Sequence, residues 1–504
     1  MVGSGIGGLT AAAHLVRAGL HVLVLERNPH PGGTAYVYHR RGFDFPMGPL
    51  GFSQPGLVRD SLKDLRVGDA IRLSRVHYRI RAFGLDIPLS LPFPEMVEEL
   101  GGLFPAEAQG VQRFFKSIEE MILKPNQESG ISASEYLKGP IKDWRLRRIL
   151  GSIGTKKPYS GLPLLAAMWN LMCKEGIWYP AEGMRSFCER LVKAVRRNFD
   201  HRQSGGPEGE KSGIGEIRLN KEVAEIRVEN GRVLGVTLKD GVQIDSHSVI
   251  SNADYRTTFV KLIGPEMVLR EWYAAVSTAR QTGSIFQVCL GIDGRKVDLS
   301  AFRKASRIIY RRDPKDTEEE TLHWDAVEID PEAFAGQELE VSLWGTDEKT
   351  ASSGKKGVIV IRVEAEYHHF AGYRSVSTRR IPEYRGYKTR LGRALIHEIE
   401  NLIPGLEKGI LVMDIGTPLT FEDQGGRSEG AVAGWSWDYE DFRDDKPKEL
   451  ICTPIQGLYM AGYQAFSALF MGGVPTAMES GRRAAQAVLD GAGPIEEIRI
   501  PRGQ

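Results

Sequence analysis

The sequence has little cysteine and almost no net charge. Its 504 residues include four cysteines, Cys173, Cys188, Cys289 and Cys452, and no two of them form a C-x-x-C motif. This spacing offers no disulfide framework and no paired-cysteine metal motif, so we expect reduced, buried thiols in a cytoplasmic protein. The 66 basic and 65 acidic residues leave a net charge of +1, which predicts no electrostatic surface for nucleic acid.

The chain also lacks an apolar run that is typical of a membrane span. Its longest uncharged stretch, residues 450–478, is long enough to cross a bilayer but contains Pro454, Pro475 and several glycines. That composition favours a buried strand, a loop and the start of a helix over a spanning segment. No secretory signal precedes the first motif, which again favours a cytoplasmic protein.

The most informative pattern that is present lies in the first 33 residues. Gly3, Gly5 and Gly8 form G-x-G-x-x-G, followed by a small-residue helix over 9–17 and a buried strand over 21–25. In a dinucleotide-binding unit these glycines allow a tight turn, close approach of a pyrophosphate and close packing of helix on sheet. The pyrophosphate then lies at the positive helix N-terminus. The predicted nucleotide-binding residues of this turn are Gly3, Gly5, Ile6, Gly7 and Gly8.

An acidic residue, a basic residue and a glycine pair follow this strand. Glu26 is placed to accept hydrogen bonds from ribose hydroxyls, as it would in either an NAD or an FAD site. Arg27 comes next, and Gly32-Gly33 precede Thr34. This order resembles the extended FAD motif of the flavin amine oxidase and phytoene desaturase superfamily. The resemblance implies one non-covalent FAD per chain, with Glu26, Arg27, Gly32, Gly33 and Thr34 at its site.

The strand before the glycine turn is short in this sequence. Only Met1 and Val2 precede Gly3, whereas a strand usually has about five residues. A late start codon or a trimmed sequence would explain this. We therefore expect an abbreviated central strand, which would weaken the fold beside the cofactor.

Two further segments resemble the same superfamily. Phe43, Asp44, Gly48 and Pro49 match G-F-D-F-x-x-G-P, which implies that Gly48 lies close to the flavin. Asp44 is either a site residue or a structural turn carboxylate. Consecutive strands over 217–252 contain two hairpin turns. By resemblance, the Val223 backbone meets the adenine there and Asn252 lies where the chain leaves the cofactor domain.

The end of the chain resembles the segment that closes the FAD site in this superfamily. A strand over 458–461 stops at Gly462, and a helix begins after the sequence G-G-V-P at 472–475. A second helix N-terminus would thus face the phosphates or the flavin. The resemblance implies that Gly462, Gly473 and Val474 bind the cofactor.

These patterns predict an α/β fold: a Rossmann-like FAD-binding domain with a discontinuous α+β substrate domain built on an antiparallel sheet. The predicted cofactor domain comprises residues 1–75, 175–254 and 445–504, and the substrate domain 76–174 and 255–444. The apolar stretch 158–173 is either a core helix or the wall of an apolar substrate pocket. An amphipathic helix over 100–121 is our candidate for peripheral membrane contact.

The resemblance implies an FAD-dependent oxidoreductase that acts on carbon–carbon double bonds of a long apolar isoprenoid or polyene. Desaturation, saturation and isomerisation all remain open. Thr34, where phytoene desaturases commonly have arginine, and a long aromatic segment over 463–471 favour the isomerase or saturase branch. The alternatives are an FAD-dependent amine oxidase and a non-enzymatic flavin scaffold or lipid carrier.

The sequence identifies no catalytic side chain, no metal ligand and no oligomeric state. The segments placed nearest the flavin by resemblance, 48–51, 430–434 and 472–475, supply glycine, proline and apolar residues. Hydride transfer with a bound flavin depends on closeness and orientation more than on a strong acid or base. We therefore expect no single side chain to be the whole catalyst.

Overall fold

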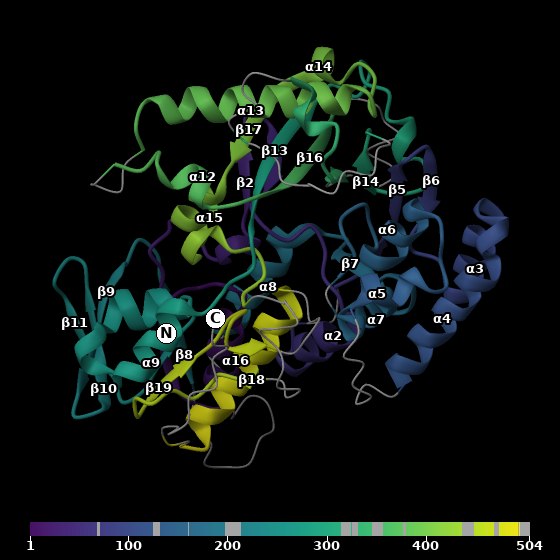
Figure 1. Cartoon of the computed structure of the whole chain (residues 1–504). Coiled ribbons are helices and arrows are strands. Elements are labelled where there is room, and N and C mark those ends of the chain that lie inside the picture. Colours follow the sequence, from purple (N-terminus) through teal and green to yellow (C-terminus); the bar gives the residue numbers. More distant parts are fainter. Residues whose placement is uncertain are drawn as a thin grey trace.

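The computed structural model describes three packed regions: a small parallel sheet, a larger mixed sheet and a group of helices (Figure 1). The described residues are 1–67, 71–123, 132–159, 161–196, 213–313, 324, 331–344, 356–375, 380–435, 448–467, 473–491 and 493. The small parallel sheet and the larger mixed sheet both combine strands that are far apart in the sequence.

The small sheet is the Rossmann-like part of the fold. Its strands are β1 (His21–Leu25), β8 (Ile214–Arg218), β12 (Val249–Ser251) and β19 (Leu458–Met460). β1 pairs in parallel with β8, and β12 pairs in parallel with β19. Val2 forms parallel bridges to Leu25 and Ser251, so the short first strand lies between these two pairs. The beginning, middle and end of the chain therefore meet at the place where the glycine turn starts.

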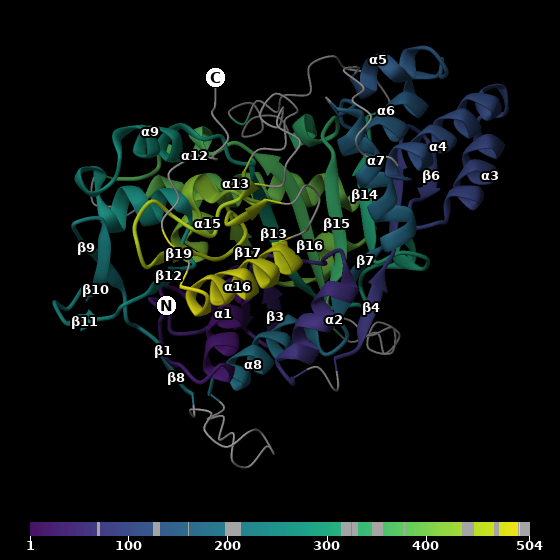
Figure 2. The ribbon, with the colours of Figure 1, turned by 90° about the horizontal axis from the view of Figure 1, so that it is seen from below.

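Two glycine-rich helices cover this sheet. α1 (Ile6–Arg17) and α16 (Gly473–Leu489) lie side by side in Figure 2. At their contact, a Cβ added to Gly481 would overlap the carbonyl oxygen of Gly7 and lie 3.0 Å from Cβ of Thr10. A Cβ added to Gly8 would overlap the carbonyl oxygen of Gly3. Glycine is therefore needed both where helix packs on helix and where helix packs on strand.

The larger sheet has seven strands in the order β17-β13-β16-β15-β14-β5-β6. They are β5 (Tyr78–Ala82), β6 (Leu85–Pro88), β13 (Ser284–Ile292), β14 (Arg307–Arg311), β15 (Leu339–Trp344), β16 (Gly357–Ala365) and β17 (Ile410–Gly416). All neighbours are antiparallel except β14 and β5, which pair in parallel. The predicted antiparallel sheet is thus a mixed one. β5 and β14 come from distant segments, so no tight hairpin fixes their relative direction.

The two faces of this sheet differ in chemistry. Phe286, Val288 and Leu290 alternate along β13 and pack against Leu391 and Leu395 of the long helix α13 (Glu383–Glu400). Figure 1 shows α13 lying over this face. The residues between them in the strand point to the opposite face, toward the Rossmann-like part. That second face carries the polar residues that build the site described below.

The helical group packs at the side of the large sheet. Its members are α3 (Phe93–Leu103), α4 (Ala108–Leu123), α5 (Ala133–Lys138), α6 (Trp144–Ser152) and α7 (Leu162–Asn170). The single helix predicted over 100–121 is wrong, because the chain breaks at Phe104 and Pro105, where proline supplies no N–H. The apolar face of α4, including Phe114 and Ile118, is buried in the core. Among the described residues, no helix is both long and apolar enough to cross a bilayer.

Shorter elements join the three regions. They are β2 (Val37–Arg40), β3 (Phe43–Pro46), α2 (Pro55–Asp64), β4 (Leu73–Val76), β7 (Ile177–Pro180), α8 (Gly183–Arg196), β9 (Val223–Glu229), β10 (Arg232–Leu238), β11 (Gln243–Asp245), α9 (Arg270–Thr278), α12 (His368–Ala371), α14 (Leu406–Gly409), α15 (Pro418–Gly425), β18 (Lys448–Glu449) and β20 (Phe466–Ser467). Tyr255, Phe259 and Trp272 pack in the Rossmann-like core, although residues 255–444 were assigned to the substrate domain. The domain limits stay a prediction.

The contact between α1 and α16 gives a stability prediction. Gly481→Ala should lower the midpoint of thermal unfolding, because the added methyl group overlaps backbone of α1. Overpacking of this kind amounts to about 1–3 kcal/mol. Gly56→Ala in α2 is the matched control, since a Cβ there meets no atom within 4 Å. That variant should melt at or slightly above the wild-type temperature. Equal midpoints for the two variants would contradict this account of the helix contact.

Candidate functional site

A cavity of about 610 Å³ lies between the Rossmann-like part and the polar face of the large sheet. Its volume is within the usual range for small-molecule and cofactor sites. All the residues predicted to bind the cofactor, except Gly8, line it: Gly3, Gly5, Ile6, Gly7, Glu26, Arg27, Gly32, Gly33, Thr34, Gly48, Val223, Asn252, Gly462, Gly473 and Val474. Gly472 lies outside the described residues.

Asn252 fixes the glycine turn from far along the chain. Its Oδ1 accepts a hydrogen bond of 2.9 Å from the backbone N–H of Gly8. A Cβ added to Gly5 would lie 2.5 Å from Asn252 Nδ2, so the amide packs directly on the turn. Gly8 therefore supports the cavity from behind instead of lining it, which matches the packing role expected for this glycine.

The N-terminus of α1 presents a free donor to the cavity. The helix begins at Ile6, whose N–H is on the side of the parallel bridge between Gly5 and Gly32, and the backbone N–H of Gly7 donates to no acceptor in the described part of the chain. Unpaired N–H groups at a helix N-terminus form a ready anion site. α16 also begins at the cavity, where Gly473 and Val474 line it. Two helix N-termini thus contribute positive potential to one space.

Glu26 braces the glycine turn from the strand side. One carboxylate oxygen accepts hydrogen bonds from the Ser4 backbone N–H at 2.8 Å and the Ser4 hydroxyl at 2.7 Å. The other accepts from the Asn28 N–H at 2.9 Å. Glu26 is only 5% exposed and still lines the cavity. Its side chain therefore holds the turn and faces the place where the resemblance puts the ribose.

A segment from late in the chain reaches the glycine pair. Arg27 is exposed and donates to the Asp423 carbonyl at 2.8 Å, which ties β1 to α15. Thr34 accepts a hydrogen bond of 2.7 Å from Arg427. Arg427 lines the cavity but was missed in the sequence, because only tertiary structure brings it beside Thr34.

The sheet wall of the cavity carries a row of polar side chains. Gln287, Arg362 and Glu340 are register partners on three neighbouring strands, so their side chains share one face. Arg362 donates to Gln287 Oε1 at 2.7 Å and to the Gly48 carbonyl, and burial lowers its pKa. Glu340 lines the cavity and accepts a hydrogen bond from no described residue. The available sequence signal for Arg362 was a charge directly after the apolar run V-I-V-I of β16.

A second arginine ties the sheet to the same loop. Arg307 donates to the Leu50 carbonyl at 2.8 Å. Its neighbour in the adjacent strand is Tyr78, which lines the cavity. Burial, and then the charge of Glu340, raise the pKa of Tyr78, so this phenol stays protonated near neutral pH. Arg362 and Arg307 thus anchor residues 48–50 against the wall that a substrate would meet.

The apolar part of the cavity does not come from the segment that was considered for it. Its apolar lining includes Leu50, Leu262, Ile285, Phe421 and Val432. No described residue of 158–173 lines it, so for this part of the stretch the pocket-wall interpretation is wrong. Leu165 and Trp169 instead pack in the helical core, where the Trp169 ring contacts Phe114 and Phe115 edge-on. This segment buries its apolar side chains against α4, away from the cavity.

Two carboxylates, the candidate Asp44 and a cavity residue, Glu422, have structural partners. Asp44 lies on the hairpin of β2 and β3, pairs with His39 at 2.9 Å and Arg185 at 3.0 Å, and does not line the cavity. The structural reading of Asp44 is therefore favoured. Glu422 does line the cavity, but it accepts a hydrogen bond from Tyr367 at 2.7 Å and pairs with Arg374.

The cysteines supply no activated nucleophile. Cys173, Cys188 and Cys289 are buried, and burial raises the pKa of each thiol to about 12. Cys452 is partly exposed and forms no disulfide in the described chain. A raised pKa keeps the thiolate fraction very small near neutral pH, so the three buried thiols are inert.

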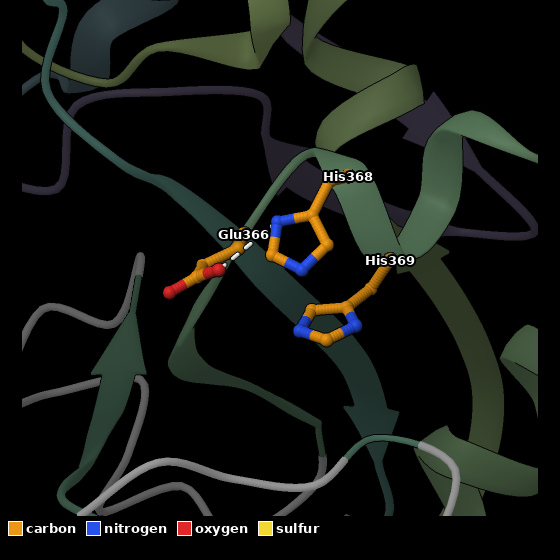
Figure 3. A group of neighbouring side chains, drawn as sticks. All are labelled: Glu366, His368 and His369. Carbon is orange, nitrogen blue, oxygen red and sulfur yellow. Dashed lines mark ion pairs between the residues drawn. The ribbon is translucent and has the colours of Figure 1, made fainter.

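One surface group has the composition of a metal site. Glu366, His368 and His369 place one ligand atom each within 4.8 Å of one another (Figure 3). Glu366 and His368 already form a 3.0 Å pair, and their side chains are 60% and 69% exposed. None of the three lines the 610 Å³ cavity. An exposed group of this kind, without a second observation, supports no metal function.

Sequence comparisons connect the chain to carotenoid-modifying proteins. Residues 1–65 match the family model of the NAD(P)-binding Rossmann-like domain. Phytoene desaturase (lycopene-forming) of Pseudescherichia vulneris is 26% identical over 58% of this chain and 63% of its own length, so that match spans less than two thirds of the relative. Prolycopene isomerase of Daucus carota is 26% identical over 92% of this chain and 76% of its own. A Danio rerio protein named inactive all-trans-retinol 13,14-reductase is 24% identical, covering 97% and 85%.

Solved structures agree on the fold. An oxidoreductase from Methanosarcina mazei superposes with a TM-score of 0.62 at 16% identity and covers 96% of this chain and 99% of that one. Putrescine oxidase bound to putrescine gives a TM-score of 0.56 at 13% identity, covering 97% and 98%. The predicted Rossmann-like fold with a second, sheet-based unit is therefore confirmed, and the curated homologues are phytoene desaturases, prolycopene isomerases and a retinol reductase.

Proposed function

We propose that this chain is an FAD-dependent oxidoreductase that acts on carbon–carbon double bonds of a long polyene or isoprenoid. The observation that carries the proposal is the single cavity, which joins a dinucleotide-type glycine turn to a partly apolar wall of the large sheet. The curated relatives named after phytoene, prolycopene and retinol support the same class of substrate.

The residues around the cavity fit a bound FAD. The free N–H group of Gly7 suits the pyrophosphate, and Glu26 suits the ribose. A Cβ added to Gly473 would meet no atom of the described residues within 4 Å, and Gly473 itself lines the cavity. FAD, when bound, supplies the hydride-transfer chemistry, and the protein supplies binding and orientation.

The sheet wall would orient the substrate. Leu262, Ile285 and Phe421 offer apolar contact to a polyene, while Arg362 and Glu340 mark a polar position among them. Glu340 is the wall carboxylate without a hydrogen-bond donor among the described residues, so it is the first acid–base candidate. Desaturation, saturation and isomerisation all use this arrangement, and the proposal does not separate them.

Peripheral membrane contact belongs to the same proposal, because a polyene must be taken from lipid. Leu103 and Leu123, at the ends of α3 and α4, are large apolar side chains that are 42% and 74% exposed. They replace the buried face of 100–121 as the candidate contact. Oxidation of an amine remains the alternative function, since putrescine oxidase shares the fold.

A substrate comparison tests the proposal. Purified protein, with its flavin either oxidised or first reduced with dithionite, is mixed without oxygen with liposomes that contain phytoene, prolycopene or all-trans-retinol, or with putrescine, and the flavin absorbance is followed. Phytoene should reduce the oxidised flavin, or prolycopene or all-trans-retinol should perturb or reoxidise the reduced flavin, and putrescine should do neither. A response to putrescine alone would support the amine oxidase, and no response to any of the four would contradict both enzymes. Flotation of the same liposomes should carry part of the protein upward.

Glu26 gives a binding prediction. Glu26→Ala should weaken FAD binding by about 1–3 kcal/mol, the scale of a lost charge-assisted hydrogen bond. The dissociation constant is measured on apoprotein by flavin fluorescence. Glu216→Ala is the control, because Glu216 is an exposed carboxylate on the adjacent strand that pairs with Arg218 and does not line the cavity. An unchanged dissociation constant in Glu26→Ala would reject its assignment to the ribose.

A further inference from the structure

Arg427 occupies an unusual place for a charged side chain. It lines the cavity between η9 (Ser428–Gly430) and α15, and its guanidinium stacks on the Tyr463 ring at 4.5 Å from the centroid. Its hydrogen bonds go to neutral acceptors: the Thr34 hydroxyl at 2.7 Å, the Ala431 carbonyl at 3.2 Å and the Val432 carbonyl. The side chain is therefore held in one orientation from several sides.

The positive charge of Arg427 has no carboxylate partner within ion-pair distance in the described chain. Asp254 is the carboxylate whose field reaches it, and that carboxylate is engaged by Ser428 and the Thr257 N–H. Burial lowers the pKa of Arg427, yet an arginine stays charged at neutral pH. Arg427 is only partly buried, but a partly buried cation without a carboxylate partner in the described chain still makes this part of the cavity favourable for an anionic ligand.

The position of Arg427 identifies which part of a dinucleotide it would meet. Thr34 follows Gly33, and a Cβ added to Gly33 would lie 3.1 Å from Cα of Gly5, the N-cap of α1. The guanidinium is therefore at the same end of the cavity as the N-terminus of α1 and the free N–H group of Gly7. The anionic group of FAD is its pyrophosphate, and arginine is well suited to phosphate oxygens.

We propose that Arg427 binds the pyrophosphate of the bound dinucleotide, so that a distant segment supplies the guanidinium beside the glycine pair. The residue after that pair is Thr34, which receives a hydrogen bond from Arg427 and cannot itself provide a charge. The inference rests on one part of the proposed function, which is that the cavity binds a dinucleotide. It adds a binding residue that no local motif contains.

Ligand binding to apoprotein variants tests the inference. Arg427→Gln should raise the dissociation constants of FAD and of ADP-ribose about 10-fold to 100-fold, because both ligands contain the pyrophosphate. Riboflavin, which has no phosphate, should bind with an unchanged constant. Arg427→Lys should show a smaller loss, because lysine keeps the charge but not the two-pronged geometry.

Moving the arginine separates ligand binding from a structural role. The double variant combines Arg427→Gln with Thr34→Arg. It removes the guanidinium from residue 427 and places one at residue 34, which is its hydrogen-bond partner in the wild type, so a guanidinium is again present at this end of the cavity. This variant should recover at least part of the affinity for FAD and ADP-ribose. Loss of a merely structural contact would not be restored in this way.

The matched control is Arg256→Gln. Arg256 pairs with Glu429 at 2.7 Å and donates to the Ala279 carbonyl at 3.0 Å, so it braces the same η9 segment without lining the cavity. Its removal should leave both dissociation constants unchanged. An Arg427→Gln protein that keeps wild-type affinity for FAD and ADP-ribose, or loses riboflavin equally, would overturn the inference.

The proposed cofactor can fail separately. If the wild-type protein binds ADP-ribose tightly but not FAD, the flavin assignment is wrong while Arg427 can still be judged with ADP-ribose. If Arg427→Gln does not fold, Arg427→Lys carries the same comparison. A normal affinity for ADP-ribose in Arg427→Lys would then reject the role.

Discussion

One turn of backbone, residues 3–8, sets the constraint on which the rest of the structure depends. It leaves the N–H of Gly7 unpaired among the described residues at the start of α1, and it leaves no room for side chains where α1 meets the sheet and α16. Glu26 holds the turn from one side and Asn252 from the other. Because Asn252 and Gly481 lie hundreds of residues further on, distant segments complete the surroundings of the turn.

The glycine turn and the polar face of the large sheet line the same cavity. Arg362 and Arg307 donate to carbonyls of Gly48 and Leu50, so the sheet and the loop beneath it are a joined wall. The other face of the same sheet is apolar and covered by α13, as Figure 1 shows. The polar wall arises because successive side chains of a strand point to opposite faces of the sheet. Each strand buries one set of side chains under α13 and directs the other set toward the cavity.

Local pattern was enough to predict the glycine turn and the acid at Glu26, because these depend on short-range spacing. The return of the chain's end to the site was predicted only from the resemblance to the superfamily. The local pattern gave wrong predictions where contacts between residues distant in the sequence determine the structure. The helix over 100–121 is interrupted at Pro105, and the apolar stretch 158–173 packs on that helical group instead of the cavity. Arg362 and Arg427 were missed because an isolated arginine carries no motif, and only tertiary structure brings each of them to the cavity.

The central claim is that this cavity holds one FAD without a covalent bond. The most direct measurement is to denature the protein as purified, separate the released small molecules from the polypeptide and identify both by mass spectrometry. The account predicts free FAD in about equal amount to the chain, and a polypeptide of unmodified mass. NAD or NADP as the released nucleotide, or a flavin that stays attached to a peptide, would contradict it.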